Sequence, residues 1–219
     1  MTRPVPPVLW TAPPRGSVLV LAPHPDDETL ACGGVISLHA DQGDQVTVIV
    51  VTDGAAGDPA GRYPGVDYVS LRQGESRRAA EILGVSSLLF WGYPDGRLVE
   101  ATDLSDRLVD AIRTIRAVTL YHPSALEVHP DHWAVAMAVD QALGALSTPP
   151  QAAACEVWAA IRPSHILDIT SVWARKQKAL EQYETQLRYN DYLHMIAGLN
   201  AYRTIYLPSA RFVEAFEVR

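Results

Sequence analysis

The stretch SVLVLAPHPDDETLACGG, residues 17–34, predicts the fold of the chain. Its first part, SVLVLAP (17–23), is aliphatic and β-branched, which is typical of a buried strand. From Thr29 onward, TLACGGVISLHADQG (29–43) has the length and apolar content of a helix that ends at Gly43. A strand that leads directly into a helix is the repeating unit of a parallel α/β sheet.

The same alternation of strand and helix continues along the chain. Further strands are predicted at QVTVIVVTD (45–53), SSLLFWG (86–92), AVTLYHP (117–123), ACEVWAAI (154–161) and TIYL (204–207). Further helices are predicted at 69–84, 104–117, 132–146 and 169–187. Nearly continuous apolar runs indicate strands that are covered on both faces. The predicted fold class is therefore α/β: a Rossmann-like, mostly parallel open sheet with helices on both faces.

Composition and charge indicate the kind of protein. We expect one domain over residues 1–219, with an extended, proline-rich leader at 1–16. Apolar residues make up 48% and charged residues 20%, as in folded globular proteins. The net charge of −7, without a basic run, argues against nucleic acid or an anionic membrane as a partner. Two cysteines are too few for a thiolate metal site or a disulfide framework.

No apolar stretch reaches the ~18 residues that a membrane span needs. The leader lacks the apolar block of a signal peptide, so we predict a cytoplasmic protein. The sequence leaves a homo-oligomer open. Residues 54–68 are rich in Gly and Pro and form a long predicted loop, which we expect to be a wall or lid of a binding pocket.

Titratable side chains cluster where two predicted strands end. His24, Asp26 and Asp27 follow the strand at 17–23, and EVHPDH (127–132) follows the strand at 117–123. In parallel α/β sheets, ligands bind beyond the carboxyl ends of the strands. If these two strands are neighbours, the two turns meet there. Imidazole and carboxylate together form the ligand set of catalytic zinc.

A structural interpretation of the same residues also exists. Asp27, Thr29 and Asp131 precede or begin helices, where such side chains commonly serve as N-caps. For Asp131, capping is the favoured interpretation over the alternative that it orients a histidine. Two similar turns, each with His and Asp at a strand end, nevertheless favour a metal site.

PHPDDE followed by HPDH resembles the paired signature of the PIG-L (LmbE-like) family of zinc-dependent de-N-acetylases. The similarity continues through VTDG (51–54), 71–85, YPDG (93–96), 168–186 and 202–217, so it covers most of the chain in order. The resemblance implies a Rossmann-like α/β fold, in agreement with the alternation of strands and helices.

The resemblance also implies roles for individual residues. It assigns zinc to His24, Asp27 and His132, the general base to Asp26, stabilisation of the oxyanion or acid assistance to His129, and sugar contacts to Arg72 and Asp95. One Zn²⁺ per chain is expected, with another divalent metal left open. A neighbouring carboxylate is expected to raise the pKa of His129 and keep it protonated at neutral pH.

Two residues depart from the family pattern. Glu127 stands where the family often has aspartate, and Tyr183 where it has a histidine. Neither change affects the implied metal ligands. We expect them to alter substrate contacts and the depth of the pocket.

The function predicted from the sequence is removal of an N-acetyl group from an N-acetylglucosamine-type, small-molecule sugar conjugate. The alternatives are a non-catalytic sugar- or metal-binding protein and a hydrolase of a different amide. A binding protein would need neither Asp26 nor His129. A nucleotide-binding dehydrogenase is disfavoured because the first turn lacks G-x-G-x-x-G, and a two-metal phosphoesterase because the two turns offer too few ligands. The sequence does not identify the aglycone.

Overall fold

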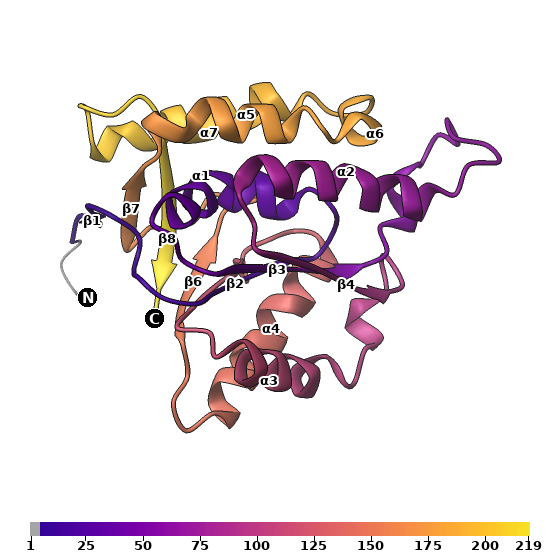
Figure 1. The fold of residues 1–219 in the computed structure, drawn as a ribbon, viewed down its shortest axis with the longest axis horizontal. Helices are drawn as coiled ribbons and strands as arrows, with labels where there is room; N and C mark the ends of the chain where they lie inside the picture. The colour runs from indigo at the N-terminus through magenta and orange to yellow at the C-terminus, as the bar shows by residue number, and fades with distance from the viewer. Residues whose placement is uncertain (1–4) are drawn as a thin grey trace.

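The computed structural model describes residues 5–219, in which eight strands form one sheet (Figure 1). The strand order is β1-β7-β8-β6-β5-β2-β3-β4, and only β8 runs antiparallel to its neighbours. The strands are β1 (Val8–Trp10), β2 (Val18–Ala22), β3 (Val46–Thr52), β4 (Ser87–Tyr93), β5 (Thr119–Pro123), β6 (Gln151–Cys155), β7 (His165–Asp168) and β8 (Val213–Val218). The predicted open, mostly parallel sheet is confirmed.

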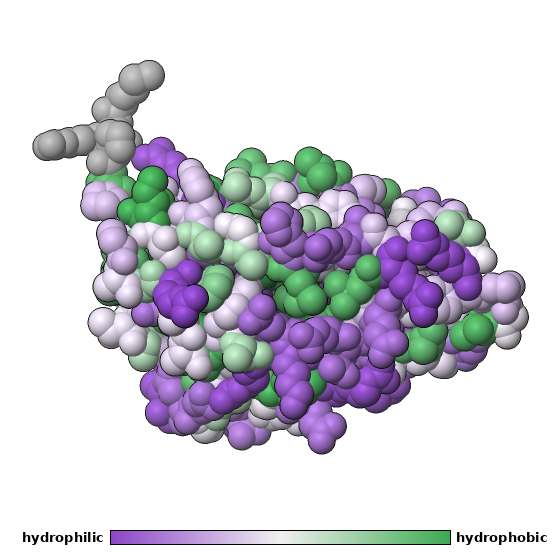
Figure 2. Space-filling view, turned by 90° about the horizontal axis from the view of Figure 1, so that it is seen from above, coloured by the Kyte–Doolittle hydropathy of each residue, from purple (hydrophilic) through white to green (hydrophobic). Residues whose placement is uncertain are grey.

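Helices cover both faces of this sheet. They are α1 (Asp27–Asp41), α2 (Tyr68–Leu83), α3 (Leu104–Ile115), α4 (Pro130–Ala145), α5 (Trp173–Leu180), α6 (Glu184–Leu187) and α7 (Tyr192–Tyr202), with short 3₁₀ turns η1 (Ala55–Gly57), η2 (Leu98–Glu100), η3 (Thr170–Val172) and η4 (Arg203–Tyr206). Helices α1, α2, α5 and α7 lie on one face, and α3 and α4 on the other (Figure 1). Seen from the side of α5 and α7, apolar residues form separate groups among hydrophilic ones (Figure 2). Within residues 5–219, no helix has the length and apolar content to span a bilayer.

The core has one apolar layer on each face of the sheet. In β2, Val18 and Val20 pack toward α1, whereas Leu19 and Leu21 pack toward α3 and α4. Successive strand side chains point to opposite faces. A strand with both faces covered must therefore be apolar at every position, which is why the alternation of polar residues is absent from β2.

The two central strands β2 and β5 bring the two HPD turns of the sequence together. Strand β2 pairs in parallel with β5 on one side and with β3 on the other, with Val18 opposite Thr119 and Val46. Their carboxyl ends consequently lie at one edge of the sheet. The predicted adjacency of the strands that precede the two HPD turns is confirmed.

Several predicted elements in the second half of the chain are wrong. The strand predicted at 154–161 is β6, which ends at Cys155. The buried carboxylate of Glu156 then accepts a hydrogen bond from Ile161 N (2.8 Å) and pairs with Arg203, which folds the chain into a loop. TIYL (204–207) is not a strand and lies mostly in η4, and the terminal strand is β8, between β6 and β7.

The helix predicted at 169–187 is interrupted. It consists of η3, α5 and α6, because α5 ends at Leu180 and Glu75 binds Thr185 through both its main-chain N (2.8 Å) and its hydroxyl (2.6 Å). Of the predicted leader at 1–16, Val8–Trp10 form the edge strand β1 against β7. Residues 1–4 lie outside the described residues.

A buried ion pair joins helix α5 to the sheet. Lys176 is fully buried and donates to Glu214 Oε1 (2.8 Å) and Asn200 Oδ1 (3.0 Å). The same Glu214 carboxylate accepts from the main-chain N of Gly34 (2.7 Å) and Val35 (2.8 Å) in α1. A buried charge is tolerated only when its hydrogen bonds are satisfied. To satisfy these, α1, α5, α7 and β8 must approach one another closely.

Gly34 allows this approach, and its replacement tests it. A Cβ on Gly34 would lie 2.5 Å from Ile169 Cγ2 and 2.8 Å from Glu214 Oε1. Gly34→Ala should therefore lower the free energy of unfolding by about 1–3 kcal/mol, the usual cost of overpacking. The matched control is Gly144→Ala in α4, where a Cβ meets no atom within 4 Å; it should stabilise by up to about 1 kcal/mol. Urea denaturation of both variants checks the prediction, and equal effects would contradict it.

Acid should destabilise the fold through His122 of β5. This ring is 2% exposed and its Nδ1 is 2.9 Å from Pro123 O. Burial lowers the pKa of His122 to about 4, with Arg219 lowering it and Asp140 raising it to smaller extents. The unfolded chain therefore binds more protons between pH 6.5 and pH 4, and stability falls as the pH falls through this window.

The expected loss between pH 7 and pH 5 is about 2 kcal/mol. His122→Asn keeps a donor near Pro123 O but does not titrate, so its cost should be independent of pH. Parallel pH series of urea denaturation should show that wild type loses about 2 kcal/mol more than the variant. Parallel curves for the two proteins would show that His122 does not contribute to the pH dependence of stability.

Candidate active site

Three donor atoms from the two HPD turns form a compact triangle. His24 Nδ1 lies 3.2 Å from Asp27 Oδ2 and 3.2 Å from His132 Nε2, and His132 Nε2 lies 3.1 Å from Asp27 Oδ2. His24 and Asp27 follow β2, and His132 lies in the first turn of α4. The pairing of β2 with β5 therefore produces the triangle.

The triangle fits a tetrahedral metal ion. Zinc ligands at about 2.0–2.1 Å in tetrahedral geometry lie about 3.3 Å from one another, close to all three measured separations. Donor atoms of His24, His129 and His132 also lie within 4.8 Å of one another, as do those of His24, Asp95 and Asp131. The set with Asp27 joins two imidazoles with one carboxylate, which is the donor chemistry of a catalytic zinc site.

Each histidine of the triangle also contacts a carboxylate through its other ring nitrogen. His24 Nε2 lies 3.1 Å from both Asp131 Oδ2 and Asp95 Oδ1. His132 Nδ1 lies 3.4 Å from Glu127 Oε2, an ion-pair distance that is long for a hydrogen bond. Carboxylates in this position orient metal-binding imidazoles. From the sequence we expected Glu127 to alter substrate contacts, but this buried carboxylate faces His132 instead.

The interpretation of Asp131 as a helix cap is wrong. The N-cap of α4 is His129, whose Nδ1 accepts a hydrogen bond from Asp131 N (3.2 Å). The Asp131 carboxylate instead reaches across the edge of the sheet to His24. It also accepts from Gly96 N (2.7 Å) and Leu98 N (3.0 Å), which fixes the turn after β4 against the site.

Asp27 and the two histidines of the triangle shift one another's pKa. Burial raises the pKa of Asp27, but His132 and His24 outweigh this effect and hold it well below its usual range. Burial lowers the pKa of His132, and Asp27 raises it in turn, to about 9. Asp27 is thus ionised, and its negative charge favours a cation within the triangle, either a proton or a metal ion.

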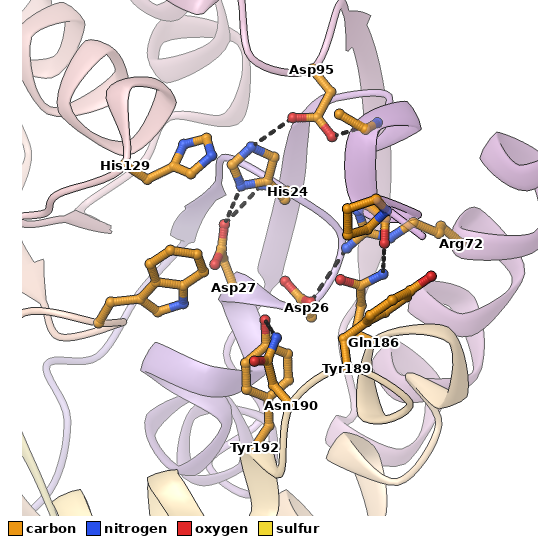
Figure 3. Close-up of a pocket in the computed structure, with 14 residues that line it drawn as sticks. His24, Asp26, Asp27, Arg72, Asp95, His129, Gln186, Tyr189, Asn190 and Tyr192 are labelled. Carbon is orange, nitrogen blue, oxygen red and sulfur yellow. Dashed lines mark hydrogen bonds and ion pairs between the residues drawn. The ribbon is translucent and has the colours of Figure 1, made fainter. Parts of the chain in front are cut away.

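Asp26 has a strained backbone. Its φ of 127° lies in a region that favours glycine, and among residues 5–219 only Arg116 is another non-glycine residue with positive φ. Such conformations cost about 1–3 kcal/mol and concentrate at functional sites. Asp26 occupies the N-cap position of α1, yet its side chain makes no capping hydrogen bond. It lines the pocket instead (Figure 3).

The Asp26 carboxyl is 4% exposed and has one basic neighbour. Arg72 Nη2 lies 3.3 Å from Asp26 Oδ2. Burial raises the pKa of Asp26 well above its usual range, and the nearby Arg72 opposes this shift. A carboxyl with a raised pKa beside a metal site has the properties of a general base.

His129 is not the cation that the sequence led us to expect. Burial lowers its pKa, and positive charge on His24 and His132 lowers it further. The expected increase is therefore wrong, because two neighbouring imidazoles outweigh the carboxylates. The hydrogen bond that Asp131 N donates to Nδ1 places the ring proton on Nε2. A neutral His129 can consequently still donate a hydrogen bond.

His24, Asp26, Asp27 and His129 line a pocket with about 660 Å³ of empty space, part of it open to solvent (Figure 3). The loop at 54–68 contributes Ala56, Gly57 and Pro59 as one wall. The other contributors are Trp158, on a loop after β6, and Gln186, Tyr189, Asn190 and Tyr192. Sequence reasoning missed this last group, since polar and aromatic residues between short helices have no distinctive spacing.

The 54–68 loop is tied to the opposite rim. Gln186 Nε2 donates to Gly57 O (3.1 Å), Arg62 Nη1 donates to Arg188 O (2.8 Å), and the Tyr189 hydroxyl donates to Asp58. These contacts indicate that the 54–68 loop is a fixed wall of the pocket and not a freely moving lid.

Arg72 and Asp95 both reach the pocket. Arg72 is 2% exposed, and its guanidinium donates to Gly54 O (3.0 Å) and Pro25 O (2.5 Å) as well as to Asp26. Asp95 lies between His24 and Ala56. Its carboxylate accepts a hydrogen bond from the main-chain N of Ala56 (3.0 Å). Both residues therefore hold loops in place, with part of their polar atoms facing the cavity.

Tyr183 does not line the pocket. It is fully buried, and its hydroxyl donates to Glu28, which is 2% exposed. Burial raises the pKa of Glu28 to about 7, and the hydrogen bond from Tyr183 opposes this shift. Tyr183 lies beneath the floor of the site, so it makes no direct substrate contact of the kind expected from the sequence.

Known proteins resemble this chain over most of its length. Diacetylchitobiose deacetylase of Thermococcus kodakarensis is 28% identical over 77% of this chain and 69% of that protein. The 4-oxalmesaconate hydratase of Pseudomonas putida is 30% identical over 90% of this chain and 86% of that protein. The structure of N,N'-diacetylchitobiose deacetylase from Pyrococcus horikoshii superposes with a TM-score of 0.81 over 93% of this chain and 83% of that one, at 21% identity, which shows a shared fold.

A family model described as GlcNAc-PI de-N-acetylase matches residues 19–143, more than half of the chain. The match includes the whole triangle, Asp26 and His129. The chain therefore belongs to the PIG-L family.

Proposed function

We propose that this chain is a zinc-dependent hydrolase that removes the acetyl group from an N-acetylglucosamine-type sugar conjugate. His24, Asp27 and His132 hold the metal in this proposal. The observation that carries it is the triangle of donor atoms with separations of 3.1–3.2 Å, directly beside a buried, strained aspartate. A site that only binds a metal has no need of the strained aspartate.

A zinc ion in the triangle would supply Lewis acidity, which polarises a carbonyl oxygen and acidifies a water molecule. Asp26 accepts the proton of the attacking water, because its carboxyl is buried and its pKa is raised. The same carboxyl returns the proton to the departing amine nitrogen. His129 donates from Nε2 to the developing oxyanion, and as a neutral donor it needs no protonated form.

Asp95 and Arg72 are proposed to contact the sugar. An ionised carboxylate offers about four acceptor sites, so Asp95 can accept from a sugar hydroxyl while it holds His24 and Ala56 N. Arg72 uses three of the five N–H donors of a guanidinium on Gly54, Pro25 and Asp26. One N–H of Nη1 remains for a hydroxyl oxygen, whereas Nε is buried and has no partner within the described part of the chain.

The charges of the pocket favour a neutral substrate. Asp26, Asp27 and Asp95 line it, and the one arginine among the lining residues is already paired with Asp26. An anionic ligand would meet net negative charge there unless the metal offset it. An uncharged acetamido sugar has no such penalty. Deacetylases are also named among the relatives.

Hydration is the second candidate, since the hydratase relative matches 90% of this chain. A hydratase of a carboxylate-bearing substrate needs cationic groups to bind it. The acidic lining of the pocket disfavours this candidate. The deciding experiment measures acetate release from a panel of N-acetylglucosaminides and, in parallel, consumption of 4-oxalmesaconate. Acetate release alone supports the proposal, whereas hydration alone or binding without turnover refutes it.

His132→Ala should abolish stoichiometric zinc. The change removes one corner of the triangle and leaves Asp27 without its strongest cationic partner. Metal content is measured by elemental analysis after dialysis against zinc-containing and then metal-free buffer. His194→Ala is the matched control, because His194 lies exposed on α7. Retention of one zinc per chain by the His132 variant would exclude this ligand set.

Asp26→Asn should lower turnover by ~10²–10⁴-fold, the usual contribution of general base catalysis. The amide keeps the shape of the side chain but cannot take the proton. Zinc content should not change, because Asp26 is not a corner of the triangle. Asp67→Asn is the control: Asp67 caps α2, and asparagine caps helices equally well. Near wild-type turnover in the Asp26 variant would mean that another group activates the water.

A further inference from the structure

We propose that Glu28 and Tyr183 form a positioning pair, which holds Asp26 in the orientation that proton transfer requires. The proposal rests on the function proposed above, in which Asp26 is the base. Neither residue lines the pocket. They act through a continuous set of contacts that runs from the main chain of Asp26, through the Glu28 carboxyl, to the Tyr183 hydroxyl.

Asp26 needs such support because its own conformation does not provide it. With φ at 127° its backbone lies outside the range that an aspartate adopts without strain. Thr29 N (3.0 Å) and Leu30 N (2.9 Å) both donate to Asp26 O, so the carbonyl is fixed by the first turn of α1. The N–H on the other side of the same residue needs a partner of its own.

Glu28 provides that partner. Its Oε2 accepts the hydrogen bond from Asp26 N at 3.2 Å, and its Oε1 accepts from the Tyr183 hydroxyl. The carboxyl is 2% exposed, so water does not compete for either oxygen. With the carbonyl held by α1 and the N–H held by Glu28, the peptide groups on both sides of the Asp26 Cα are fixed. The direction of the side chain follows from them.

Tyr183 fixes Glu28 and connects it to the rim of the pocket. It is fully buried, and Thr29 Oγ1 lies 3.3 Å from its hydroxyl. Its main-chain O accepts from Gln186 N and Leu187 N, both at 3.0 Å. Gln186 belongs to the pocket lining. Tyr183 thus joins the floor under the base to the segment that faces the substrate.

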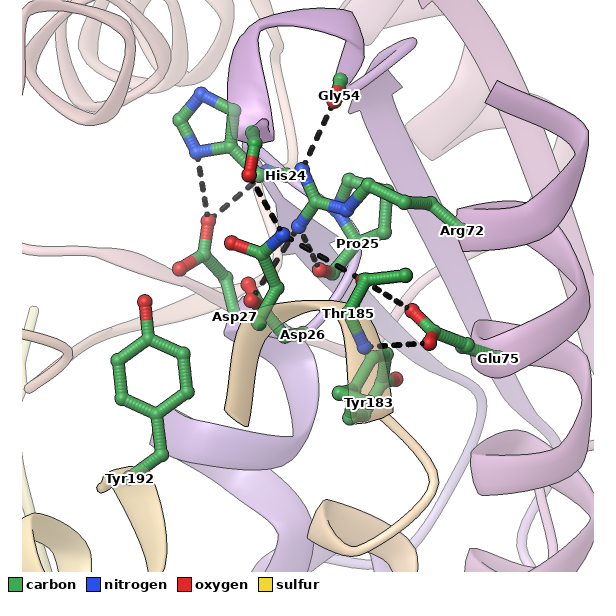
Figure 4. Close-up of polar contacts among 12 residues, drawn as sticks. His24, Pro25, Asp26, Asp27, Gly54, Arg72, Glu75, Tyr183, Thr185 and Tyr192 are labelled. Atoms are coloured by element: carbon green, nitrogen blue, oxygen red, sulfur yellow. Dashed lines mark hydrogen bonds and ion pairs between the residues drawn. The ribbon is translucent and has the colours of Figure 1, made fainter. Parts of the chain in front are cut away.

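A second support reaches Asp26 from the opposite side. Arg72 of α2 donates to the Asp26 carboxylate, and Glu75, one turn later, binds Thr185, two residues after Tyr183 (Figure 4). Helix α2 therefore contacts both Asp26 and the segment that carries Tyr183. The carboxylate of Asp26 is placed by Arg72 and its backbone by Glu28, so loss of either contact should move the base.

The alternative is that Glu28 and Tyr183 only fill the core. The two roles predict different behaviour for conservative changes. Glu28→Gln keeps an oxygen for Asp26 N and an amide for the Tyr183 oxygen, whereas Glu28→Leu keeps the approximate size and loses both contacts. Tyr183→Phe removes the hydroxyl alone. Tyr121→Phe is the matched control, because its buried hydroxyl bonds His39 (3.0 Å), outside the site.

The experiment measures kcat and KM for acetate release, zinc content, and φ of Asp26 in crystal structures of the metal-free variants. Glu28→Leu and Tyr183→Phe should lower kcat by roughly 10–100-fold with KM within about twofold, as expected when a reacting group is displaced. Zinc should stay stoichiometric, and φ of Asp26 should leave the positive region in Glu28→Leu. Glu28→Gln should recover most of kcat, and Tyr121→Phe should leave it unchanged.

Three results would overturn the pair: unchanged kcat in Tyr183→Phe, equal losses in Glu28→Gln and Glu28→Leu, or unchanged φ of Asp26 in Glu28→Leu. If Glu28→Leu does not fold, the kcat values of Tyr183→Phe and Glu28→Gln still test the proposed pair. A wild-type protein that releases no acetate would refute the proposed function instead, and the conformation of Asp26 in the variants would then test the pair by itself.

Discussion

The parallel pairing of β2 with β5 is the constraint on which the site depends. The two strands are about a hundred residues apart in the sequence, and each is followed by an HPD segment, at 24–26 after β2 and at 129–131 after β5. In-register pairing brings the two turns to one edge of the sheet, so that His24, Asp27 and His132 approach within 3.2 Å. A shift of the register by one residue would turn each side chain to the opposite face, and the triangle would be lost together with the core.

Burial of these charged groups requires polar contacts beyond those among His24, Asp27 and His132. Asp131 binds His24 and two main-chain N–H groups of the turn after β4, and Glu127 binds main-chain N–H groups of 157–159 while it faces His132. Each carboxylate thereby orients an imidazole and at the same time folds a loop. Buried polar groups are costly unless they are satisfied, so loops and ligands are mutually dependent. Removal of a single carboxylate should therefore disturb the shape of the pocket as well as the metal site.

The sequence predicted those parts of the molecule that local patterns determine. Apolar runs located β2 to β5, and the paired HPD turns located the three residues whose donor atoms form the triangle, because strand ends carry both signals at short range. Prediction failed where distant contacts decide. Glu156 ends β6 by pairing with Arg203, and Glu75 interrupts the late helix by binding Thr185. The pKa of His129 is lowered by burial and by two imidazoles, one of them contributed by a strand end about a hundred residues away. No local pattern contains such information.

The fold does not require the strained backbone conformation of an aspartate at position 26. A glycine at this position would adopt φ of 127° without cost, and the carbonyl contacts that begin α1 would remain. The chain instead carries a buried, acidic side chain there, which adds both steric strain and desolvation. Stability alone does not account for this choice. Such a residue persists only when its surroundings over-determine its conformation, and the contacts from α1, Glu28 and Arg72 do so. The backbone outlier and its three supports are thus one feature, in which the carboxyl that we propose as the base is held away from its relaxed geometry, beside the triangle of His24, Asp27 and His132.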